Sequence, residues 1–211
     1  MWWKTKPSCF TKEQEQLAVN YPSLNFSIED NTVFIRGKLQ IANIAAFEIE
    51  IKLPDDYPVS LPEVKELGGK IPIVNDRHVN YDGTCCLTVP AKMYQDLGKN
   101  YSIIDYISKF VIPFFANQIH YEINGVWANG DYNHGVQGIF EYYAELLEVK
   151  SPKIVADLMK ITLQPFPKLS QKCPCESSKR LKKCHLKSII LLKQIPFIQL
   201  ISDYKKMFLK S

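Results

Sequence analysis

Residues 47–64 have the sequence FEIEIKLPDDYPVSLPEV, and this stretch decides the fold. Its first half alternates strictly between apolar and charged side chains, from Phe47 to Leu53. This period of two predicts a strand with one face in a core and the other in solvent. Its second half carries Pro54, Pro58 and Pro62, which cannot lie inside a sheet. We therefore expect a long bend that leads into a short strand at residues 63–67.

The residues before this stretch predict more strands and one helix. Apolar and polar side chains alternate at residues 26–28 and again at 33–41, and the Glu29-Asp30-Asn31 sequence between them is typical of a turn. Together with residues 47–53 they predict an antiparallel meander with one wet face. A short helix is expected at residues 11–18, capped by Thr11 and ended before Pro22.

After the bend, residues 68–87 have little periodicity, which favours an ordered loop that carries function. Ser102 and Asp105 resemble a capping box, and a broad apolar stripe follows them. We expect a long core helix there, kinked at Pro113. Further helices are predicted at residues 139–149 and 153–163, so the fold class is α+β.

Composition and charge divide the chain. Its 211 residues are 46% hydrophobic and 23% charged, as in ordinary globular proteins. Residues 168–211 hold 11 Lys and Arg against 2 Asp and Glu, whereas residues 1–167 hold 15 against 20. We predict a main domain at residues 1–164, a zinc knuckle at 165–187 and an amphipathic helical tail at 188–211. Without a signal sequence or a span of 18 apolar residues, a cytoplasmic protein is expected.

Three cysteines and a histidine form a compact set near the C-terminus, within CPCESSKRLKKCH at residues 173–185. Four such ligands within 13 residues suit a closed tetrahedral zinc site, so the expected ligands are Cys173, Cys175, Cys184 and His185. The segment resembles the SEC-C zinc motif, whose pattern is CPCxSxKxxKxCH, and it matches every fixed position. The resemblance implies a structural zinc. Free thiols in a flexible basic tail are the alternative.

A second resemblance covers residues 11 to about 123. The order of helix, meander, Tyr57-Pro58 bend, loop and long helix is similar to that of ubiquitin-conjugating enzymes, whose catalytic segment has the pattern HPN-x5-G-x-x-C-L. Here the sequence GTCCL at residues 83–87 fits that turn. The resemblance implies a UBC-like fold and selects Cys86 as the nucleophile, with Cys85 at the usually apolar position before it. A buried, inert Cys86 and a nucleophilic Cys85 are the alternatives.

The family's HPN tripeptide falls on residues 76–78, so His78 stands where the family has its asparagine. A tetrahedral intermediate needs a donor for its oxyanion, and the His78 N–H can supply one. Equally, His78 can cap backbone carbonyls of the loop. Asp131 and His134, in a glycine-rich segment, can receive the proton of the lysine or stabilise a turn.

Several features resemble the stand-alone ubiquitin-conjugating-like proteins of bacterial antiphage operons that signal through cyclic oligonucleotides (CBASS). These features are the long helix, the NHGVQGI sequence at residues 133–139 and the appended knuckle. The resemblance implies a Cys86 thioester with the C-terminus of a partner protein and transfer to a lysine. The partner implied is a cyclic-oligonucleotide synthase, and a separate activating enzyme is compatible with it.

Two other functions are compatible with the sequence. A binding module of the same fold would use its apolar faces and need no reactive cysteine. A nucleic-acid-associated protein would use the basic knuckle, but the acidic balance of residues 1–167 argues against nucleic acid as a partner of the whole chain.

Overall fold

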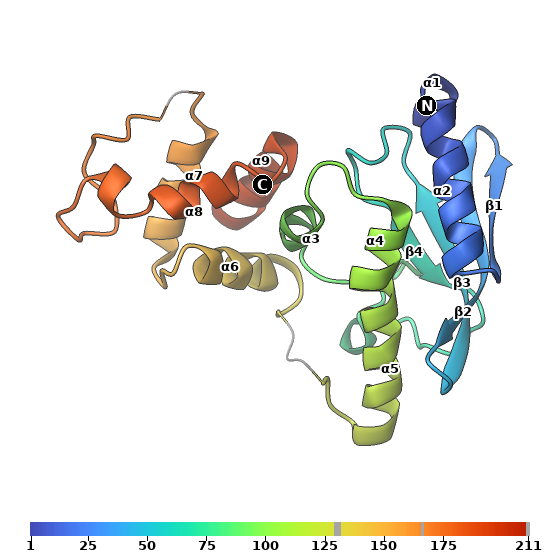
Figure 1. Ribbon diagram of the computed structural model, residues 1–211. Helices are drawn as coiled ribbons and strands as arrows, with labels where there is room; N and C mark the ends of the chain where they lie inside the picture. The colour runs from blue at the N-terminus through green and yellow to red at the C-terminus, as the bar shows by residue number, and fades with distance from the viewer. Residues whose placement is uncertain (129–131, 166, 210–211) are drawn as a thin grey trace. The chain divides into compact units, whose positions relative to one another are not determined.

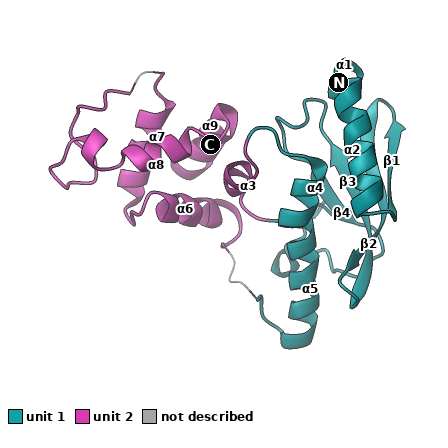
Figure 2. Ribbon diagram, viewed as in Figure 1, with its two compact units in different colours: residues 1–87, 99–131 teal, residues 88–98, 132–211 magenta. Residues whose placement is uncertain are grey.

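A computed structural model describes residues 1–128, 132–165 and 167–209 of the chain (Figure 1). The chain forms two compact units (Figure 2). Unit 1 comprises residues 1–87 and 99–131, and unit 2 comprises residues 88–98 and 132–211. This division does not follow the predicted boundaries at residues 164 and 187, because the helices expected at 139–149 and 153–163 pack with the C-terminal helices in unit 2.

Unit 1 contains a four-stranded antiparallel sheet in the order β1-β2-β3-β4. Its strands are β1 (Leu24–Glu29), β2 (Thr32–Ile41), β3 (Ala45–Leu53) and β4 (Glu63–Glu66). The register pairs Ile35 with Ile51 and Ile51 with Val64, and all three side chains are buried. The meander and its inward-facing apolar positions are therefore as the sequence predicts. Asp30 and Asn31, both with positive φ, form the predicted turn between β1 and β2.

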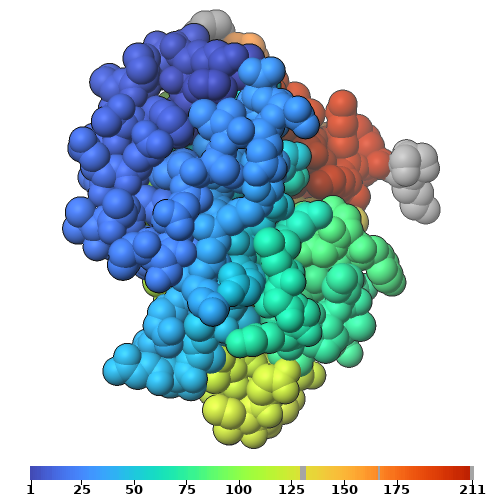
Figure 3. Space-filling model, turned by 90° about the vertical axis from the view of Figure 1, so that its right-hand side faces the viewer, coloured from blue at the N-terminus to red at the C-terminus, as the bar shows by residue number. Residues whose placement is uncertain are grey.

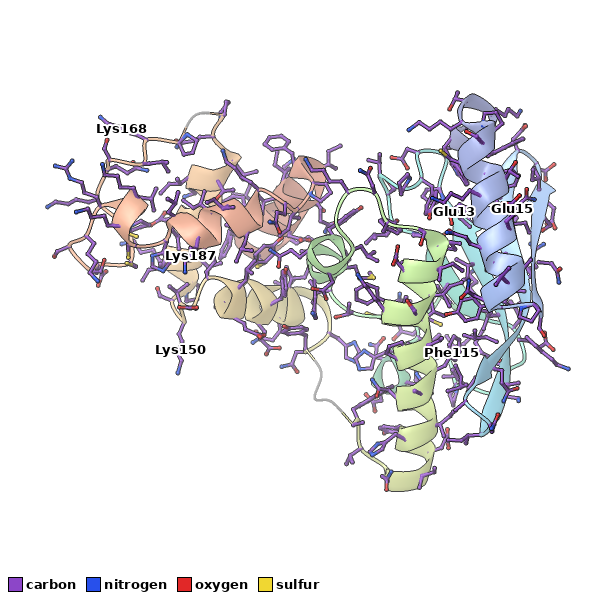
Figure 4. All side chains as sticks on the ribbon, in the orientation of Figure 1. Glu13, Glu15, Phe115, Lys150, Lys168 and Lys187 are labelled. Carbon is purple, nitrogen blue, oxygen red and sulfur yellow. The ribbon has the colours of Figure 1, made fainter. Side chains whose placement is uncertain are left out.

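The helices of unit 1 cover this sheet. They are α1 (Trp2–Thr5), α2 (Pro7–Asn20), α4 (Ile103–Tyr106) and α5 (Ile112–Asn124), with a π-helical turn at Ile107–Val111. Phe115 of α5 packs on Phe47 of β3, with ring centroids 4.6 Å apart, and lies between helix and sheet in Figure 4. In Figure 3 the N-terminal helices, in dark blue, lie beside the first strands, in lighter blue. Helix and sheet thus share one core.

One expectation about helix starts is confirmed and one is wrong. Ser102 and Asp105 form the capping box of α4. Pro113 lies in the first turn of α5, directly after the π-helical turn at Ile107–Val111, and the kink expected at Pro113 stays a prediction. Thr11, in contrast, does not cap a helix. The helix α2 begins at Pro7, a position where the missing N–H of proline has no intrahelical partner to lose. Thr11 therefore lies inside the helix, and its hydroxyl donates to the Pro7 carbonyl.

A buried carboxylate joins the bend to the helices. The hydroxyl of Tyr57 donates to one oxygen of Glu13 and the backbone N–H of Ile103 donates to the other, each at 3.0 Å. Burial raises the pKa of the Glu13 carboxyl, while both hydrogen bonds act in the opposite direction. In Figure 4 Glu13 and Glu15 lie on different sides of α2, and only Glu13 is buried. This contact holds the Tyr57-Pro58 bend against the start of α4.

Unit 2 is helical. It consists of α3 (Pro90–Leu97), α6 (Gly135–Leu146), α7 (Pro152–Leu163), a 3-10 turn at Leu181–Lys183, α8 (Leu186–Leu192) and α9 (Phe197–Phe208). Its core includes Tyr143, whose hydroxyl donates to the buried Asp203 carboxylate at 2.9 Å. The predicted helical tail is two helices, because Pro196 immediately precedes α9. The sequence also failed to predict α3.

Within the described residues of both units, none of the helices has the length and apolar character that a membrane span requires.

Candidate functional site

The loop before α3 is ordered by backbone hydrogen bonds. His78 has a positive φ of 51°, and its carbonyl accepts the N–H of Cys86 at 2.7 Å. The N–H of Cys85 donates to the carbonyl of Val64 in β4, also at 2.7 Å. Gly83, at φ 81°, lies in the turn that joins Asn80 to Thr84, where its missing Cβ avoids strain. The predicted functional loop is therefore fixed to the sheet.

The two adjacent cysteines lie in different environments. Burial raises the pKa of the Cys85 thiol to about 12, with a smaller opposing effect from a backbone hydrogen bond at Glu66. Cys85 is therefore a thiol at neutral pH. Cys86 instead lines a pocket of about 60 Å³. Cys86 is part of the pocket wall, and Cys85 is not.

One wall of this pocket is a helical face. Phe110, Pro113, Phe114 and Asn117 recur at spacings of three, one and three residues, as side chains on one side of a helix do. Lys109 and the loop residues His78, Leu87 and Trp127 complete the wall. The His78 ring meets the Trp127 ring edge-on, with centroids 4.7 Å apart. The pocket wall thus combines apolar side chains with the polar side chains of His78, Lys109 and Asn117.

The loop is clamped to the helix that carries Asn117. The Arg77 Nε donates to the Gln118 side-chain oxygen at 2.9 Å, and the Gln118 Nε2 donates back to the Arg77 carbonyl at 2.7 Å. Both residues are buried, and the Arg77 guanidinium also lies over the Tyr121 ring and pairs with Glu122. These contacts fix Arg77 relative to Gln118, and so hold the neighbouring pocket residues His78 and Asn117 in the same part of unit 1.

The structure places the predicted residues as follows. His78 and Cys86 share the pocket, and Cys85 lies beside it in the chain. His134 belongs to unit 2, where it is the N-cap residue of α6, and Asp131 lies outside the described residues. Sequence reasoning missed Lys109, Asn117 and Trp127. The helical spacing from Phe110 to Asn117 was visible in the sequence, but it did not show which side of the helix faces the loop.

The second candidate site is a metal centre in unit 2. Ligand atoms of Cys173, Cys175, Cys184 and His185 all lie within 4.8 Å of one another, so this group can hold a metal ion. The Cys173 sulfur is 3.1 Å from the His185 Nδ1, and the sulfurs of Cys175 and Cys184 are 3.3 Å apart. A tetrahedral zinc with bonds of about 2.3 Å separates two sulfurs by about 3.8 Å. Small shifts bring these four groups to that geometry.

Local backbone structure assembles the four ligands. Lys172 and Arg180 form an antiparallel bridge, and the Cys173 N–H donates to the Lys179 carbonyl at 2.9 Å. The hairpin returns the chain to Cys184 and His185 through the 3-10 turn, whose Leu181 is fully buried in the core of unit 2.

Proton affinity is uneven within this cluster. Burial raises the pKa of the Cys173 thiol to about 12. Burial also acts to raise the pKa of Cys175, but hydrogen bonds from Ser177 and the neighbouring thiols outweigh it and lower that pKa to about 6. One sulfur is therefore already close to the thiolate form in which cysteine binds a metal.

Compared with known proteins, the chain matches no family model, and no curated protein matches it significantly. Its function is therefore inferred from its residues and their geometry.

Proposed function

We propose that this chain is a ubiquitin-conjugating-like acyltransferase with a UBC fold, in which Cys86 carries the acyl group as a thioester. One observation carries the proposal: Cys86 lines a pocket under a helical face, whereas burial keeps its neighbour Cys85 protonated. A nucleophile must be accessible and must react as a thiolate. Both cysteines are partly exposed, but only Cys86 lines the pocket, and the raised pKa of Cys85 keeps its thiol protonated at neutral pH. The order of meander, bend, ordered loop and α4–α5 supports the fold assignment.

The reaction begins with an activated C-terminal carbonyl of a donor protein, held as an acyl adenylate or as a thioester. The Cys86 thiolate attacks the carbonyl carbon, a C–S bond forms, and the bond to the leaving group breaks with its electron pair. A lysine amine of the acceptor then attacks the same carbon. The C–N bond forms, the C–S bond breaks, Cys86 leaves as a thiolate, and the ammonium proton passes to a base.

Both steps pass through a tetrahedral oxyanion, which needs a hydrogen-bond donor. The backbone N–H groups of Cys85 and Cys86 are already used by Val64 and His78, so neither is available. We therefore look to the side chains of the pocket for this donor. His78 and Asn117 both carry N–H groups and both line the pocket with Cys86. A well-placed donor contributes about 2.7–4 kcal/mol to the transition state.

We assign zinc to the metal centre of unit 2. Three thiols and one imidazole are a typical zinc set, and four protein ligands leave no position open for substrate. The zinc would hold the hairpin at residues 168–183 in its folded form and take no part in acyl transfer. This assignment agrees with the SEC-C-like spacing of the ligands.

The biological context that we propose is bacterial antiphage defence, with a cyclic-oligonucleotide synthase as the donor protein and a cytoplasmic location. Its support is the sequence resemblance together with a Cys86 pocket and a metal-binding group in one chain. A separate activating enzyme would supply the adenylate or thioester.

The proposal is tested with a glycine-terminated peptide thioester as an artificial donor. The full chain should gain the peptide mass in a form that thiol reductants remove, and Cys85→Ala should behave like the parent. Cys86→Ser should gain an oxyester that reductants do not remove, and Cys86→Ala should gain nothing. Mass spectrometry of the intact protein distinguishes these states.

Two outcomes contradict the proposal in different ways. If Cys86→Ala still forms the labile adduct and Cys85→Ala does not, the nucleophile is Cys85. If neither substitution affects the biological activity, the chain is a binding module and its cysteines are incidental.

A further inference from the structure

Six cations gather on one short hairpin of unit 2. The basic hairpin, defined as residues 168–183, contains one acidic residue, Glu176, and six exposed cations: Lys168, Lys172, Lys179, Arg180, Lys182 and Lys183. None of the ion pairs found among the described residues includes any of these six. Among the described residues, no carboxylate in an ion pair therefore offsets the mutual repulsion of these cations.

The backbone brings these cations together. Lys172 and Arg180 are direct partners in an antiparallel bridge, and the Lys182 N–H donates to the Leu169 carbonyl, which places the two basic strands side by side. Like charges directly opposite each other destabilise a strand pair. An anion that binds across both side chains would relieve this repulsion.

The cluster of four metal-ligating side chains holds this arrangement from within. Cys173 and Cys175 belong to the hairpin, and Cys184 and His185 follow it directly. Ligand groups that meet within 4.8 Å fix the hairpin ends. The cations are thus presented on a fixed backbone, which lowers the entropy cost of binding an extended anion.

The surface suits a phosphate backbone better than an acidic protein. Among the described residues from 167 to 187, none is a large apolar side chain exposed to solvent. Protein interfaces need such side chains at their centre, whereas phosphate contacts need only donors with positive charge. The planar guanidinium of Arg180 also matches phosphate oxygens in pairs.

We propose that the basic hairpin binds the phosphate backbone of nucleic acid, without selection among bases. The hairpin offers no aromatic side chain on which a base can stack, so contacts to phosphate provide the affinity. The acidic balance that argues against nucleic acid for the whole chain belongs to residues 1–167, and the hairpin carries a separate, local excess of positive charge.

Fluorescence anisotropy of the full chain with a labelled 24-base-pair duplex of mixed sequence tests this surface. We expect Kd to rise steeply with salt, and a second duplex of different sequence to bind equally well. Lys172→Gln with Arg180→Gln should weaken binding at least about tenfold at 50 mM salt and reduce the slope of log K against log salt by about 2.

The matched control is Lys150→Gln with Lys153→Gln, which removes the same charge from exposed positions of unit 2 outside the hairpin. In Figure 4 Lys150 and Lys168 lie at opposite edges of unit 2. The control should bind nearly as the parent does, and zinc content and circular dichroism should be unchanged in both variants.

Three results overturn the proposal. The first is no binding at 50 mM salt, and the second is equal loss in the control variant. The third is tighter binding of polyglutamate or of phosphatidylglycerol vesicles than of the duplex, with the same dependence on Lys172 and Arg180. That result would identify an acidic protein or a membrane surface as the partner. None of these outcomes bears on Cys86, so acyl transfer is judged separately.

Discussion

The cysteines of unit 1 and unit 2 are the same residue type in two opposite situations. In unit 2, three thiols and an imidazole converge within 4.8 Å, so that together they can hold a metal ion. In unit 1, two adjacent cysteines are separated chemically, because burial raises the pKa of Cys85 to about 12 while Cys86 lines a pocket. The spacing of residues along the chain thus predicts the metal-ligating group, but it does not show which of two adjacent cysteines lines a pocket. That difference depends on contacts with distant residues.

Metal removal should have the largest effect, and only in unit 2. Structural zinc contributes roughly 10–16 kcal/mol to folding of isolated zinc-finger peptides, because a site of this kind forms only with its metal. We expect chelation or Cys184→Ala to make residues 167–187 sensitive to protease, as limited proteolysis with mass spectrometry will show.

Two controls make this result specific. Cys9→Ser changes an exposed cysteine outside both sites and should leave the proteolysis pattern unchanged. The rate at which Cys86 is alkylated should also be unchanged after chelation. Equal loss of structure in unit 1 would mean that the two cysteine sites depend on each other.

Alkylation should separate Cys85 from Cys86. Since the pKa of Cys85 is raised to about 12, its thiolate is about one part in 10⁴ at pH 8 and increases tenfold per pH unit up to that pKa. Iodoacetamide at pH 8 should therefore label Cys86 and leave Cys85 nearly unlabelled, as peptide mass mapping will measure.

The same shift affects stability in a defined direction. An unfolded cysteine ionises near pH 8.5, so the contribution of Cys85 to stability is complete below that pH and is lost as the pH rises toward 12.

The control for the alkylation experiment is the unfolded protein: in urea both cysteines should react with iodoacetamide at equal rates. Equal labelling of the native protein would show that the two environments do not differ.

Removal of a pocket amide should slow the chemistry of Cys86 without changing its access. Asn117→Ala should slow both formation and transfer of the thioester about 10²–10³-fold, because both steps create an oxyanion. Alkylation by iodoacetamide creates none, so its rate should stay the same.

Asn124→Ala is the matched control, since Asn124 lies on the same helix and its side chain donates to the His120 carbonyl. It should leave both rates unchanged. If Asn117→Ala also slows alkylation, its role is structural. If it slows neither reaction and His78→Ala slows transfer, His78 is the oxyanion donor.

The smallest effect is expected from the clamp between loop and helix. Gln118→Ala leaves the buried Arg77 Nε and the Arg77 carbonyl without their partner, which should cost about 1–3 kcal/mol in the free energy of unfolding. Urea denaturation measures this cost. Gln14→Ala, at an exposed position of α2, should stay within about 0.5 kcal/mol of the parent, and an equal change in both variants would mean that the clamp adds nothing.

Much of unit 1 was predictable from local pattern. Alternation from Phe47 to Leu53 predicted β3, and the Ser102–Asp105 pair predicted the start of α4. The prediction failed where local rules compete. Thr11 is a good cap by residue type, but Pro7 begins the helix four residues earlier. The helical tail predicted at residues 188–211 is divided in the same way, because a helix interior does not tolerate Pro196, which instead directly precedes α9.

By itself the sequence determined the strands of the meander and the set of metal-ligating residues, because each follows from a short local pattern of residue types. Only the tertiary structure decided which cysteine lines a pocket and that Asn117 stands beside it. Those facts depend on Val64, 21 positions before Cys85, and on the contact between Arg77 and Gln118, which are 41 residues apart. Burial and pKa follow from such distant contacts, and a local pattern of residue types does not contain them.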